Sequence, residues 1–297
     1  MSIVDTLNNK SLVEYIESVE HLQIEPFGDG TYRCICPLHE GAENPTSFTV
    51  FDDSNYICFS CGSNGRLIDY VMDKNDLSFK EAIEKLAEEY GYDLKRDLKY
   101  KTQMQLSDEI NRGMIEFEKH IDKCYKYVSN SRGISDEMIK KYHIGYWEKG
   151  NAVVIPQFNM YGLPVGFLYR FLDSDAKSKY KNSKNTELYV KGEHLFNLNN
   201  IRKTLKDKKC LYLCEGAFDA ISSQQMGYPS LAYFGISLTK NHVNLIKEVT
   251  QRIDCLDIIL VPDNDNKASK FISKARDLFN KIYPNANLLV ADIGDLV

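Results

Sequence analysis

The sequence lacks several features that would define its class at once. No uninterrupted apolar run reaches the roughly 18 residues that a membrane-spanning helix needs, which excludes such a helix. No basic segment followed by an apolar segment stands at the start, so a secretory signal peptide is not expected. The Gly-x4-Gly-Lys-Ser/Thr motif is absent as well, which excludes a P-loop hydrolase or helicase module. We therefore expect a cytoplasmic protein with no membrane partner.

The composition indicates a folded, globular chain. Hydrophobic residues make up 43% and charged residues 27% of the 297 residues, and this length suggests about two domains. The net charge of −5 conceals an asymmetry, because residues 1–100 carry 9 basic and 19 acidic side chains whereas residues 165–210 carry 11 basic and 5 acidic ones. A polyanion could bind to such a basic stretch, although a solvated lysine-rich surface is the simpler alternative.

Four of the eight cysteine and six histidine residues have the spacing of a zinc site. The ligands follow a Cys-x2-His and a Cys-x2-Cys pattern, in which each tight turn presents two ligands to one ion; they are Cys36, His39, Cys58 and Cys61. Four protein ligands leave no open coordination position, so we expect a structural Zn²⁺. Gly62 follows the second pair, where a turn with positive φ is often needed. Cys34 could compete for the metal, but we expect it to face a small core.

The chain divides into segments of different character. Residues 91–107 are polar and read as a linker, and a helix is predicted for residues 107–131. From residue 209 onward predicted strands and helices alternate with short turns, which indicates a parallel, helix-covered α/β sheet. The expected organisation is a zinc-binding domain at 1–97, a flexible linker at 98–106, a basic α+β part at 107–208 and a parallel-sheet domain at 209–297.

Carboxylates follow three of the predicted strands of this last domain. Glu215 comes directly after strand 210–214, and Asp263 and Asp265 come directly after strand 258–261, while Asp292 follows the final strand. Ligands bind at the carboxyl ends of the strands of a parallel sheet, and carboxylate oxygens suit Mg²⁺ or Mn²⁺. Each acidic residue alone could equally be a helix cap or a turn residue, but three groups at one edge favour a metal site.

Several motifs resemble those of the DnaG-type primases of bacteria and phages. The zinc ribbon of that family is similar to Cys36-Pro37-Leu38-His39, to Asn44-Pro45-Thr46-Ser47-Phe48 and to Cys58-Phe59-Ser60-Cys61-Gly62. The pair Glu215-Gly216-Ala217-Phe218-Asp219 and Asp263-Asn264-Asp265 resembles the signature of the Toprim fold. The basic segments Gly166–Arg170, Lys179-Tyr180-Lys181-Asn182-Ser183 and Thr186–Gly192 resemble the polymerase domain of the same family, as does Arg132-Gly133-Ile134-Ser135.

The resemblance implies a DNA primase, a DNA-directed RNA polymerase that makes short RNA primers in a bacterial cell or a phage-infected host. Its partners would be single-stranded DNA, ribonucleoside triphosphates and a replicative helicase. Glu215, Asp263 and Asp265 would be catalytic and, with Asp292, would bind Mg²⁺ or Mn²⁺, with Asp219 and Asp295 as further acidic positions. Nucleotide or template would be bound by Arg170, Lys179, Asn182 and Lys191.

Two other functions remain open at this stage. The first is a Toprim nuclease or topoisomerase-like enzyme, for which Tyr233 is the nearby tyrosine that could act as a nucleophile. The second is a non-catalytic zinc-ribbon protein that binds nucleic acid. The acidic residues Glu215, Asp263 and Asp265 are intact, which argues against the second alternative.

Overall fold

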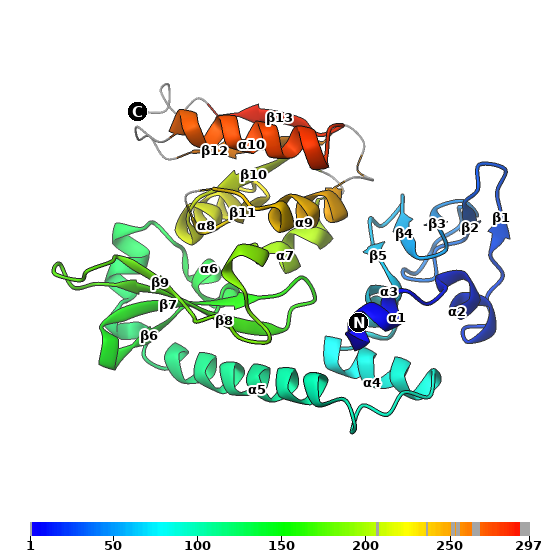
Figure 1. Cartoon of the computed structure of the whole chain (residues 1–297), viewed down its shortest axis with the longest axis horizontal. Coiled ribbons are helices and arrows are strands. Elements are labelled where there is room, and N and C mark those ends of the chain that lie inside the picture. Colours follow the sequence, from blue (N-terminus) through cyan, green and yellow to red (C-terminus); the bar gives the residue numbers. More distant parts are fainter. Residues whose placement is uncertain are drawn as a thin grey trace. The chain divides into compact units, whose positions relative to one another are not determined.

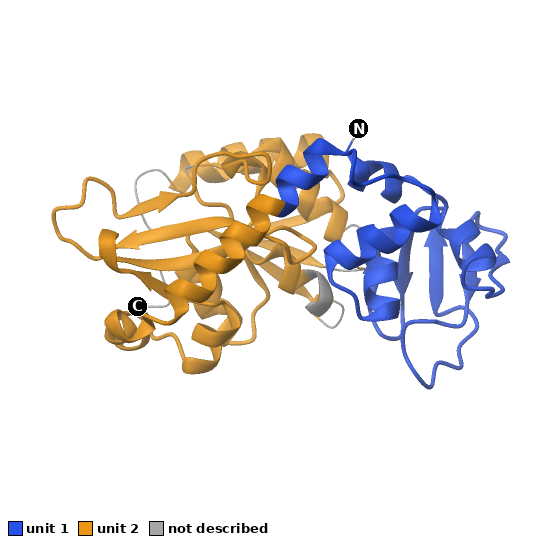
Figure 2. Ribbon diagram, turned by 90° about the horizontal axis from the view of Figure 1, so that it is seen from below, with its two compact units in different colours: residues 1–104 blue, residues 105–297 orange. Residues whose placement is uncertain are grey.

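The computed structural model describes residues 2–205, 208–235, 237–250, 253, 256–262 and 268–291. The chain forms two compact units, residues 1–104 and 105–297, and the division falls within one helix, α5 (Leu98–Glu118) (Figure 2). Among the described helices, none has the length and apolar character that crossing a membrane requires.

The first unit is a small antiparallel sheet with four helices (Figure 1). Its core is aromatic: the rings of Phe48 and Tyr56 are stacked at 5.0 Å, and Tyr70 packs edge-on against both. The helices are α1 (Ile3–Asn8), α2 (Leu12–Ser18), α3 (Leu67–Asn75) and α4 (Phe79–Glu89), and the sheet runs β1 (Glu25–Pro26), β2 (Tyr32–Cys34), β3 (Phe48–Phe51), β4 (Asn55–Cys58) and β5 (Asn64–Gly65) in that order.

Helix caps explain where two of these helices begin. Ser78 and Glu81 stand in a Ser-x-x-Glu pattern, which predicts a capping box, and they form this reciprocal box at the start of α4. At α2 the Ser11 hydroxyl accepts from the Glu14 N–H, as in a capping box, but donates to Asp53 rather than forming the reciprocal pair. Asp53 also accepts from the Val13 N–H, so a residue 40 positions away completes the cap.

The connection between the units is helical. Helix α5 begins at Leu98, nine residues before the predicted helix, and so includes the segment 98–106 that the sequence favours as a linker. One narrow stripe of α5 is buried, at helical spacing: Tyr100, Met104, Ser107 and Met114. The other residues of the helix are mostly polar, so the sequence gives little sign of this stripe. After α5 the backbone forms short pieces: η1 (Ile121–Lys123), the π-helical turn η2 (Tyr127–Ser131) and α6 (Asp136–Lys141).

The second unit contains an antiparallel sheet in the order β6-β7-β8-β9. The segment 173–187 is charged and polar, a composition typical of a loop, but it includes the short strand β9, whose register places Tyr180 directly opposite Arg170. The strands are β6 (Gly145–Trp147), β7 (Ala152–Phe158), β8 (Pro164–Phe171) and β9 (Tyr180–Asn182).

A parallel sheet in the order β11-β10-β12-β13 forms the rest of this unit, which confirms the predicted α/β fold (Figure 1). Cys214 pairs with Val261, and Leu260 pairs with Val290, so the carboxyl ends of three strands lie at one edge. The elements are α7 (Leu198–Thr204), β10 (Cys210–Cys214), α8 (Ala217–Gln225), β11 (Ser230–Ala232), α9 (Lys240–Thr250), β12 (Asp257–Val261), α10 (Ala268–Ile282) and β13 (Asn287–Val290).

One hydrophobic core joins the two sheets of the second unit. Val128 and Ile139 from the segment after α5 pack in the same cluster as Val153 of β7 and Phe218 of α8. The basic part 107–208 and the parallel-sheet part 209–297 therefore share a core. This packing brings the turn η2 next to the first turn of α8.

Candidate functional site

The four predicted zinc ligands converge in the first unit. The ligand atoms of Cys36, His39, Cys58 and Cys61 all lie within 4.8 Å of one another, and the sulfurs of Cys36 and Cys61 are 3.9 Å apart. Tetrahedral Zn²⁺ with Zn–S bonds of about 2.3 Å would place two sulfurs about 3.8 Å apart. The donor set and its spacing therefore fit a structural zinc ion.

Local backbone geometry positions these ligands. The Leu38 N–H donates to the Cys36 sulfur at 3.4 Å, and the Cys61 N–H donates to the Cys58 sulfur at 3.3 Å. Gly62 has a φ of 80° and its N–H bonds to the Cys58 carbonyl, which is the turn predicted from the sequence. Burial alone would raise the pKa of the Cys58 thiol, but backbone N–H groups, that of Cys61 foremost, lower it below its usual value. A lowered pKa favours the thiolate that binds zinc.

Cys34 lies outside this group of ligands. It belongs to β2, in register with Phe48, and burial raises the pKa of its thiol to about 11. A thiol held in its neutral form suits the packing role expected from the sequence.

Of the predicted acidic site, the structure describes Glu215 and Asp219. Glu215 directly follows β10, and its carbonyl accepts from the Phe234 N–H after β11 at 3.1 Å. Asp219 is in the first turn of α8 and lies against the backbone of Gly216, where an added Cβ would be 2.6 Å from its Oδ2. The remaining predicted carboxylates lie outside the described residues; they are Asp263, Asp265, Asp292 and Asp295.

The predicted basic residues have different surroundings. Lys179 and Lys191 are exposed, on either side of β9. Arg170 is half-buried in β8, and its Nη1 is buried without a hydrogen-bond partner among the described residues. The side-chain oxygen Oδ1 of Asn182 accepts from Gln157 Nε2 and from the Tyr189 hydroxyl, so this oxygen is used inside the sheet.

A cluster of arginines and aromatic rings that sequence reasoning did not single out surrounds Arg170. The Tyr127 hydroxyl oxygen accepts from Arg170 Nε at 2.9 Å and from Arg132 Nε and Nη2 at 2.9 and 2.8 Å. The Arg170 guanidinium lies 4.8 Å from the centre of the Tyr180 ring, and that of Arg132 lies 5.2 Å from the Phe218 ring. Arg132 was visible only as part of a family motif, and nothing in the sequence pattern distinguishes Tyr127 from other tyrosines.

The negative charge of Asp219 acts on two residues of this cluster, Arg132 and Tyr180. Burial opposes the charged form of Arg132, but the hydrogen bonds to Tyr127 and, after them, the charges of Tyr180, Tyr127 and Asp219 raise its pKa above the ordinary value. Tyr180 is subject to the charges of both arginines and of Asp219. The arginine cluster lies close to the start of α8, because Arg132 and Tyr127 both contact the ring of Phe218.

Tyr233, the tyrosine considered as a nucleophile, is a core residue. It is 3% exposed and its ring is stacked on Phe271 at 5.1 Å. This burial disfavours a tyrosine-dependent strand-cleavage mechanism.

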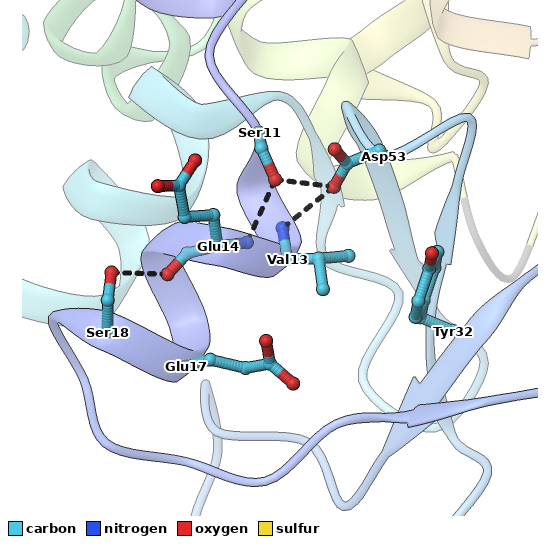
Figure 3. Close-up of a pocket in the computed structure, with 7 residues that line it drawn as sticks. All are labelled: Ser11, Val13, Glu14, Glu17, Ser18, Tyr32 and Asp53. Atoms are coloured by element: carbon cyan, nitrogen blue, oxygen red, sulfur yellow. Dashed lines mark hydrogen bonds between the residues drawn. The ribbon is translucent and has the colours of Figure 1, made fainter.

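An open pocket of about 340 Å³ lies in the first unit between α2 and the nearby strands (Figure 3). Figure 3 shows Ser11 and Val13 hydrogen-bonded to Asp53, with Glu14, Glu17 and Tyr32 at the margin. Asp53 caps α2, so its position in this pocket is explained by a structural role and does not indicate a ligand site.

The fold and the ligand geometry define a class: a zinc-ribbon unit joined to a unit with a Toprim-type parallel sheet. Three family models match the chain in consecutive segments. They are the CHC2 zinc finger at residues 1–102, the N-terminal domain of the DNA primase catalytic core at 150–202 and a Toprim-like domain at 212–295.

Known DNA primases are similar along most of this chain. The DNA primase of Deinococcus radiodurans is 29% identical over 293 residues, which cover 84% of this chain and 50% of the relative. The DNA primase of Thermotoga maritima is 26% identical, and the match covers 95% of this chain and 56% of the relative. The chain thus spans about half the length of the curated relatives it matches.

Solved structures agree with this assignment. The zinc-binding and RNA polymerase domains of the Aquifex aeolicus primase match with a TM-score of 0.57 and 26% identity, over 98% of this chain and 79% of that one. A DnaG primase catalytic domain bound to single-stranded DNA shares the fold, with a TM-score of 0.55 and 20% identity over 64% of this chain and 71% of that one. The chain is therefore similar to DnaG-type primases in its zinc ribbon, its N-terminal core segment and its Toprim-like domain.

Proposed function

We propose that this chain is the zinc-binding and RNA polymerase part of a DNA primase, which synthesises short RNA primers on single-stranded DNA. The observation that carries the proposal is the alignment of β10, β12 and β13, whose carboxyl ends lie at one edge of the parallel sheet. Glu215 is the first residue after β10, and the sequence continues to Asp263 after β12 and to Asp292 after β13.

Glu215, Asp263, Asp265 and Asp292 would hold the divalent ions. Their oxygens are the hard donors that Mg²⁺ and Mn²⁺ prefer, and like charges gathered at one edge need cations to neutralise them. When bound, such ions would neutralise the triphosphate and lower the pKa of the attacking 3′-hydroxyl. The zinc ligands would serve folding only, because four protein ligands leave no open position.

The chain's own residues would position the reactants. Arg170 can bind two phosphate oxygens through its planar fork, whereas the exposed Lys179 and Lys191 would act as point charges toward the template backbone. Asn182 would contribute its amide N–H group. The 3′-oxygen of the initiating nucleotide would form a bond to the α-phosphorus of the next triphosphate in line, while the bond to pyrophosphate breaks. Positioning and charge neutralisation account for such chemistry without a protein nucleophile.

The zinc unit would position the template and would contribute little to the overall affinity for DNA. Residues 1–100 carry an excess of acidic side chains, so charge alone would not attract DNA strongly. Weak template binding, aided by a replicative helicase, is the expected arrangement in the cytoplasm of a bacterial cell or an infected host.

A primer-synthesis assay tests this function. With single-stranded template, ribonucleoside triphosphates and Mg²⁺, products of two to about ten nucleotides are expected. Glu215→Gln should reduce synthesis by at least about a hundred-fold, because it removes a metal-binding charge. Glu137→Gln is the matched control, since Glu137 is an exposed acid in the first turn of α6. Strand cleavage or relaxation without synthesis would favour the nuclease alternative, and binding without any reaction would favour the non-catalytic one.

A further inference from the structure

The two arginines of the cluster are joined by a single neutral oxygen. Tyr127 Oη receives three N–H donors, two from Arg132 and one from Arg170, at 2.8–2.9 Å. A phenol oxygen has two lone pairs, so these donors use its accepting capacity in full. Tyr127 therefore fixes the orientation of both guanidinium groups at once.

The two guanidinium groups that share Tyr127 Oη carry like charges, so a nearby anion stabilises the pair, and Asp219 is one such anion. The ring of Phe218 lies 5.2 Å from the Arg132 guanidinium, and that of Tyr180 lies 4.8 Å from the Arg170 guanidinium. Arg170 Nη1 is buried and has no hydrogen-bond partner among the described residues. A buried charged donor without a partner is costly, and a phosphate, like a carboxylate, offers oxygens that an arginine fork can bind in pairs.

The turn η2 explains why Tyr127 and Arg132 can cooperate. The Arg132 N–H bonds to the Tyr127 carbonyl at 3.1 Å, which closes an i→i+5 turn. In a regular α-helix, five residues advance about 500°, so the two side chains would point about 140° apart. The wider π-helical turn brings them to the same side, and such turns often occur at functional sites.

We infer that Tyr127 is a positioning residue, which holds Arg132 and Arg170 as one two-armed receptor for the phosphate groups of the incoming nucleoside triphosphate. This inference rests on the proposed function for the identity of the ligand, because the cluster lies beside the first turn of α8, the helix that follows Glu215 in the sequence. Tyr127 itself would not contact the reacting atoms.

Tyr127→Phe tests the inference by removing only the hydroxyl. Tyr125→Phe is the matched control, because that hydroxyl donates to Asp136 rather than bonding to an arginine. In the full chain, calorimetric titration with Mg-GTP should show binding weakened about ten-fold or more by Tyr127→Phe and unchanged by Tyr125→Phe. In primer synthesis the KM for GTP should rise by a similar factor, while kcat at saturating GTP should change less than three-fold.

A double-mutant cycle separates positioning from general stability. If Tyr127 acts through the arginines, adding Tyr127→Phe to Arg132→Ala should weaken GTP binding by far less than it does in the wild-type background. Arg132→Lys keeps the charge but loses the fork, and it should also weaken binding even if Tyr127→Phe folds poorly.

The outcomes distinguish this inference from the proposed function. Weakened GTP binding by Tyr127→Phe supports the inference even if the wild-type chain makes no primers, in which case the proposed function alone fails. If Tyr127→Phe binds GTP as tightly as Tyr125→Phe does, the inference is overturned, whatever the synthesis assay gives. A lowered kcat with unchanged GTP binding also overturns it.

Discussion

At the scale of single residues, the junction of β10 and α8 depends on the absence of a side chain. Gly216 separates Glu215 from α8, and the carboxylate of Asp219 folds back against it. A Cβ at position 216 would lie 2.6 Å from Asp219 Oδ2, which is too close for both to keep their places. The close approach, rather than a special φ value, is what requires glycine here.

Gly216→Ala should therefore displace the carboxylate of Asp219 from its place against the backbone. We expect primer synthesis to fall about ten-fold or more, since a displacement of about 1 Å at a catalytic edge has an effect of that size or larger. The unfolding free energy of the second unit should fall by only about 1–2 kcal/mol. Both can be measured on the same preparation, by synthesis assay and by urea unfolding.

Gly113→Ala is the control for this substitution. At position 113, within α5, a Cβ would make ordinary contact with Phe167 at 3.5 Å. Alanine stabilises a helix interior by about 0.5–1 kcal/mol relative to glycine, so this variant should be slightly more stable and fully active. Equal activity of the two variants would show that the Gly216–Asp219 contact has no catalytic importance.

At the scale of elements, the zinc turns are local structures that hold one ion. Cys58→Ser should abolish stoichiometric zinc binding and unfold the first unit, because a structural zinc site contributes directly to folding. Cys34→Ser should keep one zinc per chain, because Cys34 lies outside the group of ligands. Zinc released by denaturation can be counted with a colorimetric chelator.

This pair of cysteine variants also tests the assignment of ligands. A full zinc content in Cys58→Ser would mean that another cysteine replaces it in the site. Loss of zinc in Cys34→Ser with an intact fold would make Cys34 a ligand.

Sequence patterns that involve only residues close together in the chain were sufficient to predict most of the helices, strands and turns. The Ser78–Glu81 capping box, the turn at Gly62 and the alternation of apolar strands with helices after residue 209 all depend on near neighbours. The zinc ligands could be predicted for the same reason, because each pair occupies one turn. Their convergence then needs only the pairing of β2, β3 and β4.

Features that depend on distant residues could not be predicted. The cap of α2 uses Asp53, and the role of Tyr127 depends on Arg170, 43 residues away in β8. The π-helical turn η2 has no simple periodicity, so it was included in a predicted helix 107–131. Helix α5 was placed too late because its buried stripe is narrow and its surface is polar.

At the scale of the whole molecule, each unit has its own core, and the second contains two buried histidines. His194 and His242 are 8% and 1% exposed, and burial lowers the pKa of each to about 4. The Thr239 N–H donates to His242 Nδ1 at 3.2 Å, and the ring of Tyr189 lies 5.3 Å from that of His194. Both histidines are therefore neutral in the folded protein at pH 7.

The second unit should consequently lose stability in mild acid. A histidine with a pKa of about 6.5 when unfolded and about 4 when folded binds protons more readily in the unfolded state. Its stabilising contribution is complete above pH 6.5 and is lost as the pH falls toward 4. Between pH 7 and pH 5 we expect each histidine to lower the unfolding free energy by about 2 kcal/mol. The combined loss from both histidines should be somewhat less than twice that value.

The single tryptophan, Trp147, lies in the second unit and reports on its unfolding. Urea unfolding followed by Trp147 fluorescence at pH 7 and pH 5 measures the loss directly. His242→Gln should lower stability at pH 7 but reduce the difference between the two pH values by about half. His120→Gln, at a partly exposed position, should leave that difference unchanged. If the difference is the same in His242→Gln as in the wild type, protonation of His242 does not account for the acid sensitivity.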